Sequence, residues 1–274
     1  MRGFGQLFKK DLESISLMTV ILGIGILLWD TYFYTRIGEW KAEVAIIPTM
    51  LPFGVIMFWL VLQAIQVYRH EWQTGGIHLL LALPQPGSKI ALAKLAAVLT
   101  SFTLNLLVAT FGFVWVLRAG SLHSGGVRLF NVAMEAFFQS REASSWLIKI
   151  ALWSAFAYWL IGVGTVMIFQ LVYNCSRLTA RLRFLVGLAS FFVIQWLIGL
   201  CGSIGYYVFS RVPDLVIRVP IDTLSRLDSA YGMAQAPVQT AKILINSGIL
   251  LGNALGMVLV FLVTGYLLQN VLEV

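Results

Sequence analysis

The chain has 274 residues, of which 59% are hydrophobic and only 11% are charged, and its mean hydropathy is +0.86. Soluble domains contain about 25% charged residues, so this composition excludes a water-soluble globule of this size. The net charge of +7 comes from basic residues scattered over several loops. That distribution argues against a nucleic-acid-binding face and favours contact with anionic lipid headgroups.

Six segments are apolar over the roughly 20 residues that a helix needs to cross a bilayer. The first follows Lys9 and Lys10 as a signal peptide would, but it is too long and has no small-residue cleavage site, so we interpret it as a span. The sequence therefore predicts an all-α membrane protein, a single transmembrane domain over residues 1–274, with spans at 15–34, 44–67, 95–117, 146–173, 184–209 and 243–269.

The even number of spans places both termini on one side, and basic residues near span ends indicate which side. The loop 174–183 contains Arg177, Arg181 and Arg183 and no acid, and the N-terminal segment is also basic. The loops on the other side of the membrane also contain basic residues, but acidic residues in the same loops offset part of their positive charge. We expect a multi-pass protein of the cell membrane with both termini in the cytoplasm.

The N-terminal segment 3–14 places Phe4, Leu7, Phe8 and Leu12 on one helical face, with its charged residues mostly off that face. This pattern predicts a helix that lies in the membrane interface before the first span. The alternative is an unstructured basic tail.

Two further segments, 127–139 and 212–227, are apolar but too short or too interrupted to cross a bilayer. We expect outer-face helices or dips into the interface. Asp30 is the only acidic residue in a predicted span and lies near its outer end. An ion pair with Arg36 is the favoured interpretation, and a proton or cation site is the alternative.

Neutral polar residues in the spans either hydrogen-bond between helices or line a path for cargo. The candidates for a cargo path are Gln63, Asn105, Gln195 and Asn253. Glycines form a different pattern, because they recur every fourth residue in the last span and are concentrated in the fifth. They predict close helix packing and are Gly199, Gly202, Gly205, Gly248, Gly252 and Gly256.

The loop between the second and third spans contains its own short apolar segment. Gly75 and Gly76 break the preceding helix, the run 77–83 is apolar apart from one histidine, and Pro84 and Pro86 end it. This spacing predicts a short cytoplasmic helix. It would pack at the headgroup boundary, on the rest of the chain or in a groove on a soluble partner, and the flanking helix breakers favour the partner.

A pattern in this loop resembles the cytoplasmic coupling segment of type-2 ATP-binding-cassette (ABC) exporter permeases; it consists of Glu71, Thr74, Gly75, Leu80, Leu83, Pro84, Ile90 and Lys94. The order of spans and loops along the whole chain resembles these permeases as well. The resemblance implies a pair of permease subunits, as a homodimer or heterodimer, and a separate cytoplasmic ABC ATPase subunit that binds ATP and Mg.

The same resemblance assigns residues to the ATPase contact. They are Glu71, Thr74, Gly75, Ile77, Leu80, Leu83 and Pro84, with Arg177 and Arg181 as a second contact. The implied function is export of a peptide, antibiotic or lipid-like cargo from the cytoplasm by alternating access.

No sequence motif supports catalysis by this chain. It has no GxxxxGK[ST] phosphate-binding loop, its histidines have no zinc spacing, and its two cysteines form no CxxC motif. We expect no catalytic residue, metal or cofactor here. The alternative to a permease is a membrane-anchored sensor or scaffold that recruits a cytoplasmic partner without transport. An integral-membrane enzyme is a third option, disfavoured because intramembrane acids and metal ligands are lacking.

Overall fold

The computed structural model describes residues 2–37, 47–74, 86–123, 141–179, 181–213, 215–219 and 241–270. A short 3-10 helix, η1 (Ile47–Met50), precedes the second long helix. The six long helices are α1 (Arg2–Arg36), α3 (Leu51–Thr74), α5 (Gly87–His123), α7 (Arg141–Arg177), α8 (Arg183–Val208) and α10 (Ser247–Asn270).

All six helices contain a stretch long and apolar enough to cross a membrane, which confirms the number and order of the predicted spans. Their lipid-compatible surface is extensive, since Phe184, Trp196 and Tyr207 on α8 are 80%, 66% and 76% exposed. Apolar patches of this kind are unfavourable in water, and helices satisfy their own backbone hydrogen bonds in lipid. The six helices indicate a multi-pass membrane protein.

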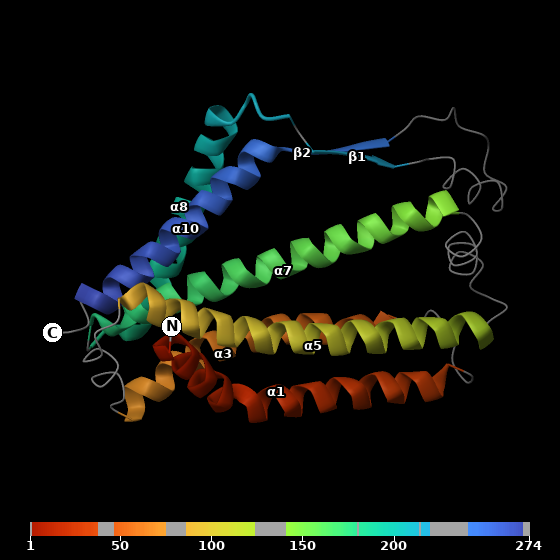
Figure 1. Ribbon diagram of the computed structural model, residues 1–274, viewed down its shortest axis with the longest axis horizontal. Coiled ribbons are helices and arrows are strands. Elements are labelled where there is room, and N and C mark those ends of the chain that lie inside the picture. The colour runs from red at the N-terminus through yellow and green to blue at the C-terminus, as the bar shows by residue number, and fades with distance from the viewer. Residues whose placement is uncertain are drawn as a thin grey trace.

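The helices form two groups (Figure 1). Helices α1, α3, α5 and α7 lie along the long axis of the molecule, whereas α8 and α10 run together and diverge from the others. Both chain termini lie at the end where the two groups meet, which we call the N/C end. It is formed by the first turns of α1, α5 and α8 and the last turns of α3, α7 and α10.

Each group has its own apolar core. Buried aliphatic and aromatic side chains of α1, α3, α5 and α7 form the larger cluster, which includes Ile15, Ile56, Leu60, Val98 and Phe102. A second cluster joins α7 to α8 and α10 through Ile168, Leu171, Ile194, Ile198 and Val260. Because α7 contributes to both clusters, it connects the two groups of helices.

Packing between α8 and α10 confirms the prediction made from the glycines. A Cβ atom added to Gly205 would lie 2.5 Å from the Gly248 carbonyl oxygen, and one added to Gly252 would lie 2.3 Å from the Cys201 carbonyl oxygen. Side chains at these positions would therefore push the two backbones apart. Gly199 is the exception, because its Cβ position has no atom within 4 Å among the described residues.

The predicted interfacial helix is the first part of α1, which is helical from Arg2 to Arg36. Its apolar face contacts the chain itself: Leu7 is buried with Ile90 and Ala93 of α5, and Phe4 packs beside them. The predicted helicity of residues 3–14 is therefore confirmed. This face packs on α5. Sequence periodicity alone does not distinguish a helix that packs on protein from one that packs on lipid headgroups.

One outer segment differs from the predicted form. Strand β1 (Leu215–Val219) pairs in antiparallel register with β2 (Ala241–Ile245), so part of 212–227 is a strand and not a helix. Valine and isoleucine favour extended backbone, and the flanking prolines Pro213 and Pro220 oppose a helix across the segment. The other outer segment, 127–139, lies outside the described residues.

Candidate functional site

The N/C end brings together most of the predicted ATPase-contact residues that the structure describes. Glu71 and Thr74 are in the last turn of α3, Arg177 ends α7, and Arg181 lies in the connection to α8. The other residues of the predicted contact fall outside the described ranges; they are Gly75, Ile77, Leu80, Leu83 and Pro84. The candidate site is therefore built from the helix ends that flank the predicted coupling segment.

A buried cluster of charged side chains connects three helices at this end. The Lys94 Nζ atom lies 2.6 Å from Oε2 of Glu71 and 3.2 Å from Oδ1 of Asp11. Lys10 reaches the other oxygen of Glu71, with Nζ 3.2 Å from Oε1. Two lysines and two carboxylates thus join α1, α3 and α5 with no net charge. We call these four residues the charged cluster.

The charged cluster is almost completely removed from solvent. The side chains of Lys94, Glu71 and Asp11 are 1%, 2% and 5% exposed, and only Lys10 is open, at 52%. Buried charges are tolerated when they are paired and hydrogen-bonded, and removal of one partner leaves an uncompensated buried charge. The cluster therefore fixes how α1, α3 and α5 meet, because each helix supplies a charge that the others neutralise.

Aromatic side chains of α3 and α7 lie beside the charged cluster. The Tyr68 ring is fully buried and packs with Ala91 and Leu268, while the Lys94 ammonium lies 5.1 Å from the ring centroid. This is a cation–π geometry. Tyr173 of α7 approaches the same ring, with the two centroids 6.2 Å apart. The contacts extend the cluster to α7 and α10.

Arg177 connects the end of α7 to the end of α3. Its guanidinium carbon lies 5.5 Å from the Trp72 ring centroid and 4.9 Å from that of Tyr173. The guanidinium also donates hydrogen bonds to the Tyr173 hydroxyl, one of them from Nε at 3.1 Å. Arg181, by contrast, is exposed. Of the two predicted arginines, Arg177 is held against the bundle and Arg181 is open to a partner.

Two of the predicted cargo-path residues belong to a hydrogen-bond network between helices. Gln63 of α3 donates to Oγ1 of Thr19 at 3.3 Å and accepts from Ser101 at 3.0 Å, and the Thr19 and Ser101 hydroxyls are 2.6 Å apart. Asn105 donates to the Ser101 carbonyl oxygen at 3.1 Å. Gln63 and Asn105 are 1% and 3% exposed. The contacts of Gln63 favour the interhelical interpretation, whereas the hydrogen bond of Asn105 stays within α5.

The other two cargo-path candidates lie in the α8 and α10 group. The Asn253 amide oxygen would be 2.5 Å from a Cβ atom added to Gly202, so the side chain fills the gap that this glycine leaves. Gln195 is exposed on the surface of α8. The structure therefore does not bring the four candidates together around one cavity.

Asp30 is placed differently from the favoured prediction. It is 1% exposed, and neither carboxylate oxygen has a hydrogen-bond partner among the described residues, Arg36 included. The carboxylate lies against Gly112 of α5, where an added Cβ atom would be 1.9 Å from Oδ2. The Arg36 guanidinium instead lies 5.6 Å from the Tyr32 ring centroid. The predicted Asp30–Arg36 pair is therefore wrong.

Sequence reasoning missed the charged cluster as a unit. In the sequence, Glu71 and Lys94 are parts of the loop pattern, and Lys10 and Asp11 are among the charged residues of 3–14 that lie mostly off the apolar face. No sequence signal joins the two sets, because the periodicity of 3–14 does not distinguish packing on α5 from packing on headgroups.

No family model, no curated protein and no solved structure matches the chain.

Proposed function

We propose that the chain is the membrane-spanning permease subunit of an ATP-driven exporter of the type-2 ABC class. It would pair with a second permease subunit and with separate cytoplasmic ABC ATPase subunits that bind ATP and Mg. The observation that carries the proposal is the buried ion pair between Glu71 and Lys94, because these residues flank the predicted coupling segment on both sides.

The ion pair gives that segment a mechanical connection to the bundle. Helix α3 ends at Thr74, three residues after Glu71, and α5 begins at Gly87, seven residues before Lys94. A force applied by an ATPase between these points would act on two helices tied together by a buried charge pair. Asp11 and Lys10 extend the connection to α1. Movement of the segment would then move three spans as a unit, as alternating access requires.

The second predicted contact lies beside the first. Arg177 packs on Trp72, which is the residue next to Glu71 in the chain. A movement of the end of α3 would therefore also move the end of α7. Arg181 is exposed in the short connection between α7 and α8 and is available to an acidic surface of a partner. The described residues of both predicted contacts lie at the N/C end, as one cytoplasmic subunit would require; they are Glu71, Thr74, Arg177 and Arg181.

The distribution of charge supports a cytoplasmic location of the N/C end. Among described side chains, this end holds acidic residues Asp11, Glu13 and Glu71 and the basic residues Lys9, Lys10, Arg69, Lys89, Lys94, Arg177, Arg181 and Arg183. Basic residues near span ends favour the cytoplasmic side. The protein would reside in the cell membrane with both termini inside, and its cargo would be a peptide, an antibiotic or a lipid-like molecule.

The test is loss of the ATPase on truncation of the coupling segment. The full chain is purified from its native membranes, and the copurifying proteins are identified by mass spectrometry and assayed for ATP hydrolysis. We expect a phosphate-binding-loop ATPase to copurify with the unchanged chain and to be lost in the double variant Leu80→Ala, Leu83→Ala. Leu92→Ala is the matched control, because Leu92 is 44% exposed on α5 near the same end.

Two outcomes would contradict the proposal. The first is that no such ATPase accompanies the unchanged chain, and the second is that the double variant retains it at an equal level. The sensor or scaffold alternative predicts a copurifying partner but no ATP-dependent movement of cargo in inverted vesicles. Equal amounts of each variant in the membrane fraction show that the change affects contact with the ATPase and not insertion.

A further inference from the structure

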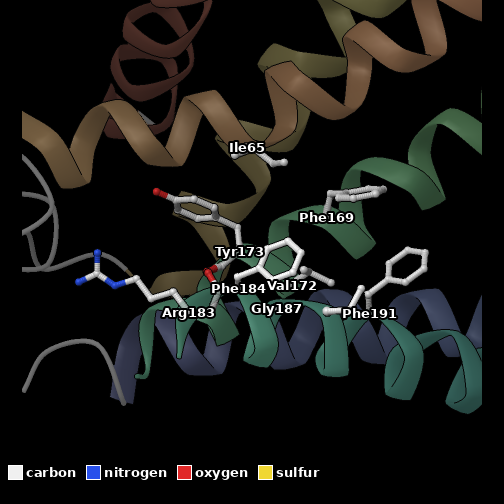
Figure 2. A pocket seen from close by; sticks show the side chains of 10 residues that line it. Ile65, Phe169, Val172, Tyr173, Arg183, Phe184, Gly187 and Phe191 are labelled. Carbon is white, nitrogen blue, oxygen red and sulfur yellow. The ribbon is translucent and has the colours of Figure 1, made fainter. Parts of the chain in front are cut away.

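A cavity of about 410 Å³ opens between α3, α7 and α8 near the N/C end (Figure 2). Its wall is largely hydrophobic and is formed by Ile65, Phe169, Val172, Phe184, Leu188 and Phe191. Two residues of this wall, Phe184 and Leu188, are 80% and 45% exposed, so the cavity opens on the surface of the bundle. Because α7 and α8 are long and apolar enough to cross a membrane, that opening would face the bilayer.

The polar groups of the cavity lie on one side. Figure 2 shows the Arg183 guanidinium and the Tyr173 hydroxyl directed to the same side, away from the rings of Phe169 and Phe191. Arg183 is the first residue of α8, at the end of a span, where lipid headgroups lie. The cavity is therefore amphipathic along its length, with a cationic rim at headgroup depth and an apolar interior toward the centre of the membrane.

Arg183 has no counter-charge in the described part of the chain. None of its neighbours in the 174–191 segment is acidic, and the lining of the cavity contains no acid. The Tyr173 hydroxyl oxygen accepts hydrogen bonds from Arg177, so its own proton remains to be donated. The rim thus offers a guanidinium fork and a phenolic donor, a combination that suits a phosphate.

We propose that this cavity binds an anionic phospholipid of the surrounding bilayer. The phosphate contacts Arg183 and the Tyr173 hydroxyl, and part of one acyl chain fills the apolar interior beside Val172 and Phe191. An acyl chain matches the apolar wall, and a negatively charged headgroup matches the Arg183 rim. Lipid binding at this site requires no ATPase, so it is tested separately from the proposed function.

Binding is measured on the purified full chain in detergent by native mass spectrometry. The probes are phosphatidylglycerol, phosphatidylcholine with the same acyl chains, and glycerol phosphate without chains. We expect phosphatidylglycerol to bind more tightly than phosphatidylcholine, and Arg183→Gln to weaken phosphatidylglycerol binding about tenfold, because it removes a charge-assisted contact. Arg211→Gln is the control, since Arg211 is also exposed but follows the C-terminal end of α8, whereas Arg183 begins this helix.

Filling the cavity tests the acyl-chain part of the proposal. Leu188→Trp enlarges a wall residue whose side chain is 45% exposed. We expect the variant to retain the circular dichroism spectrum of the unchanged chain and to bind both phospholipids more weakly. Equal binding of phosphatidylglycerol to the unchanged chain and to Arg183→Gln would overturn the proposal. So would equal binding of the two phospholipids to the unchanged chain, unchanged binding to Leu188→Trp, or glycerol phosphate binding as tightly as the phospholipid.

Discussion

Helices α1, α3 and α5 meet through charges and hydrogen bonds, whereas α8 and α10 meet through bare backbone. In the first group, Lys94 holds the carboxylates of Asp11 and Glu71 at one depth, and Gln63 hydrogen-bonds across the helices at another. In the second group, glycines allow the two backbones to touch. The chain thus packs its helices in two ways, through charged and polar side chains in one group and through close backbone contact at glycines in the other.

The difference has a mechanical meaning. A charge cluster and a directional hydrogen-bond network have one favourable arrangement, because displacement separates charges in a poorly screened environment. A smooth glycine surface has no such directional partners, and small sliding of packed helices is one of the ways in which transmembrane bundles change shape. If the protein is a transporter, we expect the first group to transmit force and the second to accommodate movement.

The largest expected effect comes from breaking the charged cluster. Among the described residues, Lys94 is the cation that contacts both buried carboxylates, and Lys94→Met leaves Glu71 with Lys10 and removes the ion pair of Asp11. Loss of one partner of a buried ion pair costs about 3–5 kcal/mol. We expect that loss in the free energy of unfolding, measured by denaturant titration of the purified chain in detergent.

Two control variants separate charge from packing in this experiment. Lys89→Met removes an exposed lysine one and a half turns earlier on the same helix and should change the unfolding free energy little. Adding Asp11→Asn to Lys94→Met removes the carboxylate that has lost its ion pair with Lys94, so the double variant should be more stable than the single one. If Lys94→Met and Lys89→Met unfold alike, the buried cluster does not stabilise the junction of the three helices.

The next effect tests the glycine contact. In Gly252→Ala the new methyl group would meet the Cys201 carbonyl oxygen at 2.3 Å and the Gly205 Cα atom at 2.9 Å, so α8 and α10 must separate. Overpacking of this kind costs about 1–3 kcal/mol. We expect a lower thermal unfolding midpoint, followed by circular dichroism at the helix band.

Gly199→Ala is the matched control at an exposed glycine of α8. No described atom lies within 4 Å of its added methyl group, and alanine favours a helix over glycine by roughly 1 kcal/mol. We expect the midpoint to stay unchanged or to rise. A fall as large as that of Gly252→Ala would show that the contact between α8 and α10 has no special requirement for small residues.

The sequence predicted the fold at the level of spans because its signal is strong and local. Each apolar run is long enough to cross the bilayer, and the charged residues and glycines near the ends of the run indicate where the helix begins and ends. The two-stranded pair was not predicted, since β1 and β2 are separated by 21 residues between Val219 and Ala241. Pairing across that separation leaves no local signature beyond the β-branched residues.

The candidate site was predictable only in part. The resemblance selects Glu71 from the loop pattern and Arg177 as part of the second contact, and the structure brings both to the N/C end. Their described roles differ from a simple surface contact, because Glu71 faces lysines of its own chain and Arg177 packs on Trp72. Which side chain a buried charge contacts depends on how helices distant in sequence approach each other. Composition and spacing within one helix do not contain that information.

The smallest expected effect concerns the hydrogen-bond network, and it tests whether neutral polar contacts contribute to the stability of the first group. Ser101→Ala removes the hydroxyl that donates to Gln63 and lies 2.6 Å from the Thr19 hydroxyl, without changing the apolar packing nearby. Interhelical hydrogen bonds in membranes contribute about 0.6 kcal/mol on average. Thr110→Ala is the control, because the Thr110 hydroxyl bonds only to the Leu106 carbonyl of its own helix. If Ser101→Ala loses more unfolding free energy than Thr110→Ala, the interhelical hydrogen bonds stabilise the first group. Equal losses would contradict this and would leave the charged cluster as the main polar connection between α1, α3 and α5.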